Sequence, residues 1–464
     1  MLFSIAASRR AKSGQTFKIQ FLDIKNAYLH ARATRDLYIE LPEEDAEEGM
    51  CGKLNMCLYG TKDAAENWEM HYKAILELLG FKQGVSNPCV FYNKEKDIRT
   101  VVYGDDFTSI GDNDSLLWFK SELAAHLTLV HKATLGPEHG DDKSVRLLNR
   151  IVEYTDNAIT FEADQRHVER IVRSLNLDTT RSNKDVTTPG VKATDVTEQM
   201  GEPLTGKAVT SFRSLVMRAA YVAQDRADIQ FATKELAIVM SAPTQGDLTA
   251  LKRLGRYLRG KPRCVLVFRF QEASTYFDAW VDSDWAGCIK TRKSTSGGVL
   301  MLGSHCLKSW SSTQSVIALS SGEAEFYGIV KGTAIGLGAV SLMKDMGIDM
   351  KLRVRTDATT GKAICSRRGL GKTRHIHCQY LWIQERVQKG DVTLIKVSTK
   401  DNIADMLTKH LAAADLEKFM HEANLVVTTG RHALAPESAD DLVDELNSLS
   451  CLLAVTYGVI NGLS

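Results

Sequence analysis

The sequence is poor in proline, in paired cysteines, in net charge and in long apolar runs. Only 8 of its 464 residues are proline, so its segments must be recognised mainly from glycine and charge. Its 9 cysteines form no Cys-x-x-Cys pair and are odd in number, which argues against a zinc module or a disulfide framework and favours a reducing compartment. With 58 Lys and Arg against 57 Asp and Glu, any surface for nucleic acid must come from local asymmetry of charge.

No apolar run approaches the ~18 uninterrupted residues that a membrane span needs. The apolar stretch at the N-terminus is short and precedes its charges, unlike the stretch in a secretion signal. We therefore expect an intracellular protein, cytoplasmic or nuclear and not secreted, with no membrane partner. The length and the 44% apolar content predict a globular chain of about two to four domains.

The first expected domain covers residues 1–112. Alternating apolar and polar residues predict a strand over 17–23 and a hairpin over 89–103. An apolar face at helical spacing predicts a helix over 63–80. A tight turn at 104–106 follows the hairpin, so this domain is expected to be a set of strands with packed helices.

The second expected domain, residues 113–275, is mostly helical and has a polar linker near 176–210. Leucines over 248–258 form an apolar stripe, accompanied by basic residues that include Lys252 and Arg256 and by no acid. Two interpretations are open. The basic side chains form either the solvated face of an amphipathic helix or a helix that tracks phosphates and releases their counterions.

The pattern changes over residues 276–412. Strands are expected over 276–283, 297–303 and 305–311, followed by a long helix from 321 and a strand over 352–356. Two helices before 390, a strand over 392–397 and a last helix from 401 complete the pattern. This order predicts a mixed sheet with helices packed on it. Residues 413–464 are expected to be a C-terminal tail, poorly ordered beyond 430 apart from a marginal helix. The whole sequence thus predicts an α/β and α+β multidomain protein.

Two neighbouring aspartates, Asp105 and Asp106, lie in the turn after the hairpin, and Asp23 ends an earlier strand. Two like charges about 4 Å apart repel by about 4 kcal/mol at an effective dielectric of 20. A bound divalent cation is the simplest way to offset this repulsion, although such a pair can also be ordinary turn chemistry. Three carboxylates at strand ends suit two Mg²⁺ ions that activate a 3′-hydroxyl and stabilise a leaving pyrophosphate.

The residues around these acids form three motifs in order: 22–29 (LDIKNAYL), 58–62 (LYGTK) and 103–106 (YGDD). Together they resemble the catalytic and template-grip motifs of copia-type retrotransposon reverse transcriptases. The resemblance implies that Asp23, Asp105 and Asp106 are the metal ligands of a polymerase palm.

By the same resemblance, Tyr28 senses the 2′ position of the incoming sugar, and Gly60 and Lys62 bind nucleotide or template. The chain departs from the family where it has Asp63 and Glu66 near the expected path of phosphates. It also begins about 22 residues before Asp23, so we expect the basic fingers to be missing. These features predict little or no nucleotide incorporation, with RNA-templated DNA synthesis as an ancestral activity.

Four more acids recur at comparable places in the third domain: Asp282 in the first strand, Glu325 in the long helix, Asp357 after a strand and Asp405 in the last helix. Asp284 is the alternative to Asp282, because it lies on the same strand face. Four acids facing one sheet would bind two Mg²⁺ ions about 3.5–4 Å apart, although acids are common enough for the spacing alone to be coincidence.

Their neighbours are more specific. Segments of this domain resemble the ribonuclease H domain of copia-type elements: 282–287 (DSDWAG), 292–297 (RKSTSG), 309–312 (SWSS), 318–325 (ALSSGEAE), 373–376 (TRHI) and 401–409 (DNIADMLTK). The resemblance implies that Asp282, Glu325, Asp357 and Asp405 are catalytic metal ligands. Residues 113–275 resemble the region that joins polymerase to nuclease in the same family.

Basic residues gather beside the second set of acids. Between 358 and 400 there are nine Lys and Arg and two acids, a local net charge of +7. A solvated surface and a grip on phosphates both explain this charge, and the neighbouring acids favour the grip. The candidate nucleic-acid contacts are Lys372, Arg374, His375, Arg292 and Lys293, together with Lys252 and Arg256. His375 could equally be a core or surface histidine.

The sequence therefore predicts a truncated palm, a helical connection and a ribonuclease H-like domain. The expected main activity is Mg²⁺-dependent cleavage of the RNA strand in an RNA–DNA hybrid, with Mn²⁺ as a substitute metal. The expected partners are this hybrid and a primed RNA template, and the other Pol modules are absent from the sequence. The alternative is a catalytically inactive, nucleic-acid-binding relic of a decayed element.

Overall fold

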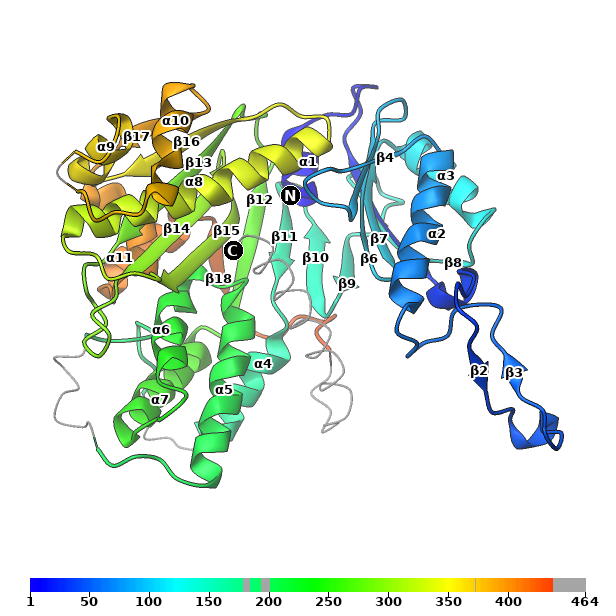
Figure 1. The fold of residues 1–464 in the computed structure, drawn as a ribbon, viewed down its shortest axis with the longest axis horizontal. Coiled ribbons are helices and arrows are strands. Elements are labelled where there is room, and N and C mark those ends of the chain that lie inside the picture. Colours follow the sequence, from blue (N-terminus) through cyan, green and yellow to red (C-terminus); the bar gives the residue numbers. More distant parts are fainter. Residues whose placement is uncertain (178–183, 193–200, 372, 437–464) are drawn as a thin grey trace.

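The computed structural model describes residues 1–177, 184–192, 201–371 and 373–436 (Figure 1). These residues build three large sheets, which follow one another from right to left in Figure 1, and a two-stranded hairpin. The mixed α/β, multidomain class that the sequence predicts is confirmed at this level.

The first sheet has the strand order β4-β5-β6-β7-β1-β8. Its strands are β1 (Lys18–Ile24), β4 (Lys82–Gln83), β5 (Val90–Asn93), β6 (Ile98–Tyr103), β7 (Asp106–Gly111) and β8 (Leu129–Leu135). Helices α2 (Ala64–Leu78) and α3 (Asn113–Ala124) share one apolar core with this sheet, in which Trp68, Phe107 and Phe119 are fully buried. The expected boundary at residue 112 differs from the structure, because β8 pairs with β1 and extends the sheet to residue 135.

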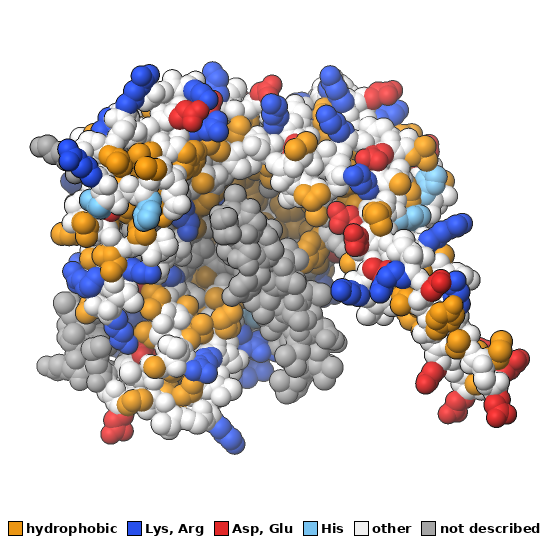
Figure 2. All heavy atoms as spheres, viewed as in Figure 1, with side chains coloured by type: hydrophobic (Ala, Val, Ile, Leu, Met, Phe, Trp, Pro, Cys, Tyr) orange, Lys and Arg blue, Asp and Glu red, His pale blue; other side chains and the backbone are white. Residues whose placement is uncertain are grey.

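Two strands of the N-terminal part stand apart from this sheet. β2 (Tyr38–Ile39) and β3 (Gly52–Lys53) pair as a hairpin that projects at the lower right of Figure 1. Its tip is acidic (Figure 2), with the exposed residues Glu43, Glu44, Asp45, Glu47 and Glu48.

The second sheet lies in the middle, with the order β18-β12-β11-β10-β9. Its strands are β9 (Ser144–Leu147), β10 (Arg150–Tyr154), β11 (Ala158–Glu162), β12 (Arg263–Arg269) and β18 (Leu425–Thr428). The helices that accompany it are α4 (Gln165–Ser174), α5 (Lys207–Ala223), α6 (Ala227–Ile238), α7 (Gln245–Gly260) and α11 (Ala413–Glu422). In α7 the leucine stripe is buried as expected, at Leu251, Leu254 and Leu258.

Residues 113–275 contain the helices α3 to α7, in line with the expected mostly helical character, and the strands β8 to β12 also run through them. One expectation for this region is wrong. Residues 413–428 are not a tail, because α11 packs into the second core and β18 pairs with β12. The expected linker at 176–210 falls partly outside the described residues, and α5 begins before its end, at Lys207. The predicted helix of the far C-terminus also lies outside them.

The third sheet has the order β15-β14-β13-β16-β17. Its strands are β13 (Tyr276–Ser283), β14 (Thr295–Leu302), β15 (His305–Thr313), β16 (Lys351–Thr356) and β17 (Val392–Lys396), and its helices are α8 (Ser321–Asp345), α9 (Thr359–Ser366) and α10 (Trp382–Gln388). β13, β14 and β15 are antiparallel, whereas β16 runs parallel to β13 and to β17. The last helix expected from Asp401 is instead a pair of 3₁₀ turns, η6 (Thr399–Asp401) and η7 (Ile403–Leu407).

Helix α8 packs across the third sheet and reaches the first one. Its length and apolar composition would allow it to cross a membrane, but much of it is buried in the core against β13, β14 and β16. At its C-terminal end, Arg99 of β6 donates from Nε to the Met346 carbonyl oxygen at 2.9 Å, and Asp345 accepts from the Ser86 backbone N–H at 2.8 Å. The third sheet is therefore tied to the first through one helix.

Candidate metal centres

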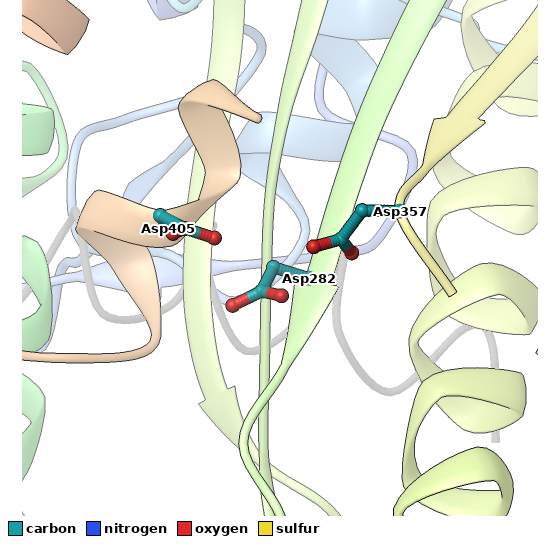
Figure 3. Close-up of side chains that lie close together, drawn as sticks. All are labelled: Asp282, Asp357 and Asp405. Atoms are coloured by element: carbon teal, nitrogen blue, oxygen red, sulfur yellow. The ribbon is translucent and has the colours of Figure 1, made fainter. Parts of the chain in front are cut away.

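The structure brings three of the predicted acids together at one edge of the third sheet. Asp282 is the last residue but one of β13, Asp357 follows β16, and Asp405 lies in η7 (Figure 3). One carboxylate oxygen from each lies within 4.8 Å of the others. Because β13 and β16 are parallel neighbours, their carboxyl ends meet at the same edge, and this places Asp282 beside Asp357. We call these three residues the second carboxylate cluster.

Two contacts hold η7 over this edge. The side chain of Asn402, which is fully buried, donates to the Val281 carbonyl oxygen at 2.9 Å and to Asp357 Oδ1 at 3.5 Å. Gly297 in β14 allows η7 to approach the sheet, because a Cβ there would lie only 2.6 Å from the Thr408 side chain. The 3₁₀ turn thus replaces the expected helix in a segment that is anchored to the sheet at both of its ends.

Glu325, the fourth predicted ligand, projects from the first turns of α8 next to the second carboxylate cluster. Burial, together with the charges of Asp282 and Asp357, raises the pKa of Glu325 to about 9. Its oxygen is not part of the compact group of three. The structure therefore places Glu325 beside the cluster, close enough to feel two of its charges.

The second carboxylate cluster is chemically suited to a divalent cation. Burial and the Asp282 charge raise the pKa of Asp405 to about 7. Among the residues that the structure describes, Glu325 Oε2 and Asp405 Oδ1 are buried oxygens without a hydrogen-bond partner. Buried polar atoms are almost always paired, and hard carboxylate oxygens are the ligands that Mg²⁺ prefers. These acids fit a Mg²⁺ site.

A lysine contacts two acids of the cluster. Lys409 Nζ lies 3.0 Å from Asp405 Oδ2 and 3.5 Å from Asp282 Oδ2, and the Thr408 hydroxyl donates to Asp282. The ammonium lowers the repulsion among the carboxylates, and a metal ion would compete with it for the same oxygens. Lys409 was not predicted as a site residue, although its place four residues after Asp405 is a detectable signal.

Asp284, the alternative ligand, is used elsewhere. Its carboxylate accepts a hydrogen bond from the Thr295 backbone N–H, and burial raises its pKa. It lies outside the compact group of acids. The geometry favours Asp282 over Asp284.

The first set of acids lies at the end of β1 and at the β6–β7 turn. Asp23 and Asp106 face each other in the β1–β7 register, and Lys132 Nζ lies 2.9 Å from Asp23 Oδ1 and 2.7 Å from Asp106 Oδ1. Burial raises the pKa of Asp105, and the charges of Asp106 and Asp23 add to this. In the described chain, these three do not form a group as compact as the second carboxylate cluster. Lys132 on β8 was also missed, because no sequence spacing links it to the acids.

The predicted nucleotide and template residues lie in the segments between β1 and α2. The rings of Tyr28 and Tyr59 are 4.6 Å apart, and Trp68 Nε1 donates to the Gly104 carbonyl oxygen at 2.8 Å, directly before Asp105. Gly60 has a φ of +92°, which only glycine adopts readily, and Lys62 is exposed.

Asp63 is less disruptive than the sequence suggested. Arg35 donates to both of its oxygens, at 2.6 and 3.0 Å, and this hydrogen bonding lowers the pKa of Asp63 to about 2. Its negative charge is therefore compensated by a neighbouring cation, whereas Glu66 is exposed.

The predicted nucleic-acid contacts are spread over three surfaces. Arg374 and His375 are exposed on the loop after α9, whereas Lys372 lies outside the described residues. On the β13–β14 loop, Arg292 is exposed and Lys293 is partly exposed. On α7, Lys252 is exposed and Arg256 is partly buried. In the basic segment, Arg386 pairs with Asp391 and Lys389 pairs with Glu385. The net positive charge is therefore carried by the other Lys and Arg residues of the segment. The roles of these residues stay predictions.

Known proteins of one kind resemble this chain. Residues 6–180 match the family of reverse transcriptases (RNA-dependent DNA polymerases). The chain is 29% identical over 425 residues to a retrovirus-related Pol polyprotein from transposon RE1 of Arabidopsis thaliana, a match that covers 87% of this chain and 27% of that protein. It is 26% identical over 407 residues to the Pol polyprotein from transposon TNT 1-94 of Nicotiana tabacum, covering 84% and 30% respectively. Over most of its length, this chain is similar to the Pol polyproteins of copia-type retrotransposons.

The Pol chain spans a little over a quarter of the length of the curated Arabidopsis relatives it matches. The reverse transcriptase match contains Asp23, Asp105 and Asp106. The match to the RE1 polyprotein covers 87% of the chain and therefore continues well beyond residue 180. The expected resemblance to copia-type Pol polyproteins is confirmed.

Proposed function

We propose that this Pol chain cleaves the RNA strand of RNA–DNA hybrids at the second carboxylate cluster. The observation that carries the proposal is the convergence of Asp282, Asp357 and Asp405, with Glu325 beside them, at one edge of the third sheet. The order and direction of its strands support a ribonuclease H-like unit over residues 276–412. The free cysteines of the described chain agree with action inside the cell, in a reducing compartment.

The residues of the cluster have different roles in this proposal. Two bound Mg²⁺ ions would supply a nucleophile from water and stabilise the leaving 3′-oxygen. Asp282, Asp357 and Asp405 hold the metal positions from three separate elements, and Glu325 adds a fourth oxygen ligand. Lys409 keeps the acids together and lies close enough to meet a phosphate. The exposed basic residues around Arg374 bind the backbone of the hybrid electrostatically.

Cleavage of a labelled RNA–DNA hybrid by the purified chain in Mg²⁺ tests this function. Asp357→Asn keeps the shape of the side chain and removes its charge, so we expect it to abolish cleavage. Asp391→Asn is the matched control, because Asp391 is an exposed acid that pairs with Arg386. Cleavage retained in Asp357→Asn removes that residue from the site, and retention in Asp282→Asn as well would overturn the mechanism.

A second candidate function is RNA-templated DNA synthesis at the first set of acids. It is favoured by the placement of Asp23, Asp105 and Asp106 at adjoining strand ends within the reverse transcriptase match. The ion pair of Asp63 with Arg35 removes one of the reasons to expect weak nucleotide binding. Primer extension on RNA that disappears in Asp105→Asn supports this function, and a chain that neither extends nor cleaves is the inactive relic.

A further inference from the structure

Glu323 is a buried acid of α8 to which no role has yet been given. It lies two residues before Glu325 in the first turn of α8, so its side chain faces another direction. Only 2% of it is exposed. We propose that Glu323 is a positioning residue, which fixes the imidazole of His375 at the rim of the second carboxylate cluster for contact with a phosphodiester of the hybrid. The proposal rests on the proposed hybrid cleavage and deepens it.

Three donors converge on the Glu323 carboxylate. The Leu319 backbone N–H donates to Oε2 at 2.9 Å, the Tyr327 hydroxyl donates to Oε1 at 2.8 Å, and His375 Nε2 lies 2.8 Å from Oε2. A buried carboxylate is stable only when its oxygens are paired. Tyr327 of α8 and Leu319, just before that helix, orient Glu323 locally, so that His375 is the one of the three partners that comes from a distant segment.

The contact determines which ring nitrogen of His375 faces outward. An ionised carboxylate has no proton to donate, so Nε2 must carry the hydrogen in this bond. Nδ1 therefore points away from Glu323, and 45% of the His375 side chain is exposed. A carboxylate that fixes the orientation and tautomer of a histidine is a common way to prepare the ring for a substrate or a metal.

His375 meets the start of α8, the helix that also carries Glu325. Glu323 and Glu325 are in the same helical turn, and Glu325 feels the charges of Asp282 and Asp357. Gly361 at the start of α9 lies against Glu325, since a Cβ there would be 3.1 Å from the Glu325 Cβ. His375 follows α9 on the loop that returns to Glu323. An anionic backbone passing over the cluster would meet this ring, which makes the scissile-strand phosphate its expected ligand.

A double-mutant cycle tests the positioning role. In Glu323→Ala the ring loses its acceptor, and we expect kcat/KM for hybrid cleavage to fall by about tenfold or more, as for other residues that orient a functional histidine. Glu323→Gln keeps an oxygen acceptor and should recover most of the activity. In a His375→Ala background, Glu323→Ala should cause no further loss. Glu385→Ala, an exposed glutamate in the same basic segment, is the matched control.

A second readout does not depend on cleavage. The ¹⁵N shifts of the His375 ring, assigned by their loss in His375→Ala, should show the hydrogen on Nε2 in the wild type and a mixture of tautomers in Glu323→Ala. The proposal is overturned if these shifts do not change, or if Glu323→Ala lowers cleavage by the same factor with and without His375. If no cleavage occurs in the wild type, the proposed function fails, while the ring shifts still report whether Glu323 positions His375.

Discussion

Replacing Glu325 by glutamine should stabilise the metal-free protein at alkaline pH. The ordinary pKa of a glutamate is 4.5, and burial together with Asp282 and Asp357 raises the pKa of Glu325 to about 9. Between these values the folded state holds a proton that the unfolded state has released. Stability of the metal-free protein therefore falls as pH rises through this window, by up to about 1.4 kcal/mol per pH unit.

The size of the effect follows from the same numbers. At pH 8 the pH lies about 3.5 units above the pKa of Glu325 in the unfolded chain, so the loss of stability has an upper limit of about 5 kcal/mol. Because the neighbouring acids share part of the shift and water screens it, we expect about 2 kcal/mol. Glutamine resembles the protonated glutamate and has no charge to lose in the unfolded chain. The thermal transition of Glu325→Gln in EDTA at pH 8 should therefore lie about 4–8 °C above that of the wild type.

Thermal unfolding at pH 6 and pH 8, with and without Mg²⁺, provides the measurement. In the wild type, Mg²⁺ should raise the transition more at pH 8 than at pH 6, because a metal and a proton compete for the same oxygens. Glu325→Gln should lose much of this difference. Glu417→Gln is the control, because Glu417 is an exposed acid paired with Lys261. If the unfolding temperature in EDTA changes equally with pH in the wild type and in Glu325→Gln, the reasoning is refuted.

Three further variants test other contacts. Lys409→Met removes the ammonium between Asp282 and Asp405, so the thermal unfolding temperature in EDTA should fall and its increase on adding Mg²⁺ should grow. The control Lys418→Met in α11 should change neither quantity. An unchanged response of the unfolding temperature to Mg²⁺ would show that Lys409 does not compete with metal. Gly297→Ala places a Cβ 2.6 Å from Thr408, so hybrid cleavage should fall at least tenfold with a native circular dichroism spectrum, and wild-type cleavage would contradict the close approach. Arg99→Met leaves a carbonyl at the end of α8 unpaired and should lower stability by about 2 kcal/mol in urea unfolding, whereas a loss below about 0.5 kcal/mol would show the contact to be unimportant.

The sequence predicted the features that depend on local pattern. Alternating residues located β13 and β16, and each strand carries an acid near its carboxyl end, so the meeting of Asp282 with Asp357 follows from their parallel pairing. The helix α2 and the β5–β6 hairpin also lie close to where periodicity placed them. For such elements the deciding interactions lie within a few residues of each other.

The features that depend on distant contacts were missed. The pairing of β12 with β18 joins residues about 160 positions apart, and no local signal marks it. Lysine side chains are long and flexible, so the contacts of Lys132 and Lys409 depend on the folded surroundings. The 3₁₀ geometry around Asp405 likewise depends on Gly297, which lies on another strand.

Strand β18 has a consequence for how this polypeptide can be divided. It covers the outer edge of β12, and no other strand of the described chain pairs there. A truncated form that ends at residue 412 would expose a row of unpaired backbone groups on β12, where a second molecule could add a strand. It would also remove Leu416 and Phe419 from the core that contains Met406 of η7. Such a fragment would then self-associate, and the segment that carries Asp405 would pack less tightly. A soluble fragment for crystallisation should therefore extend through Thr428.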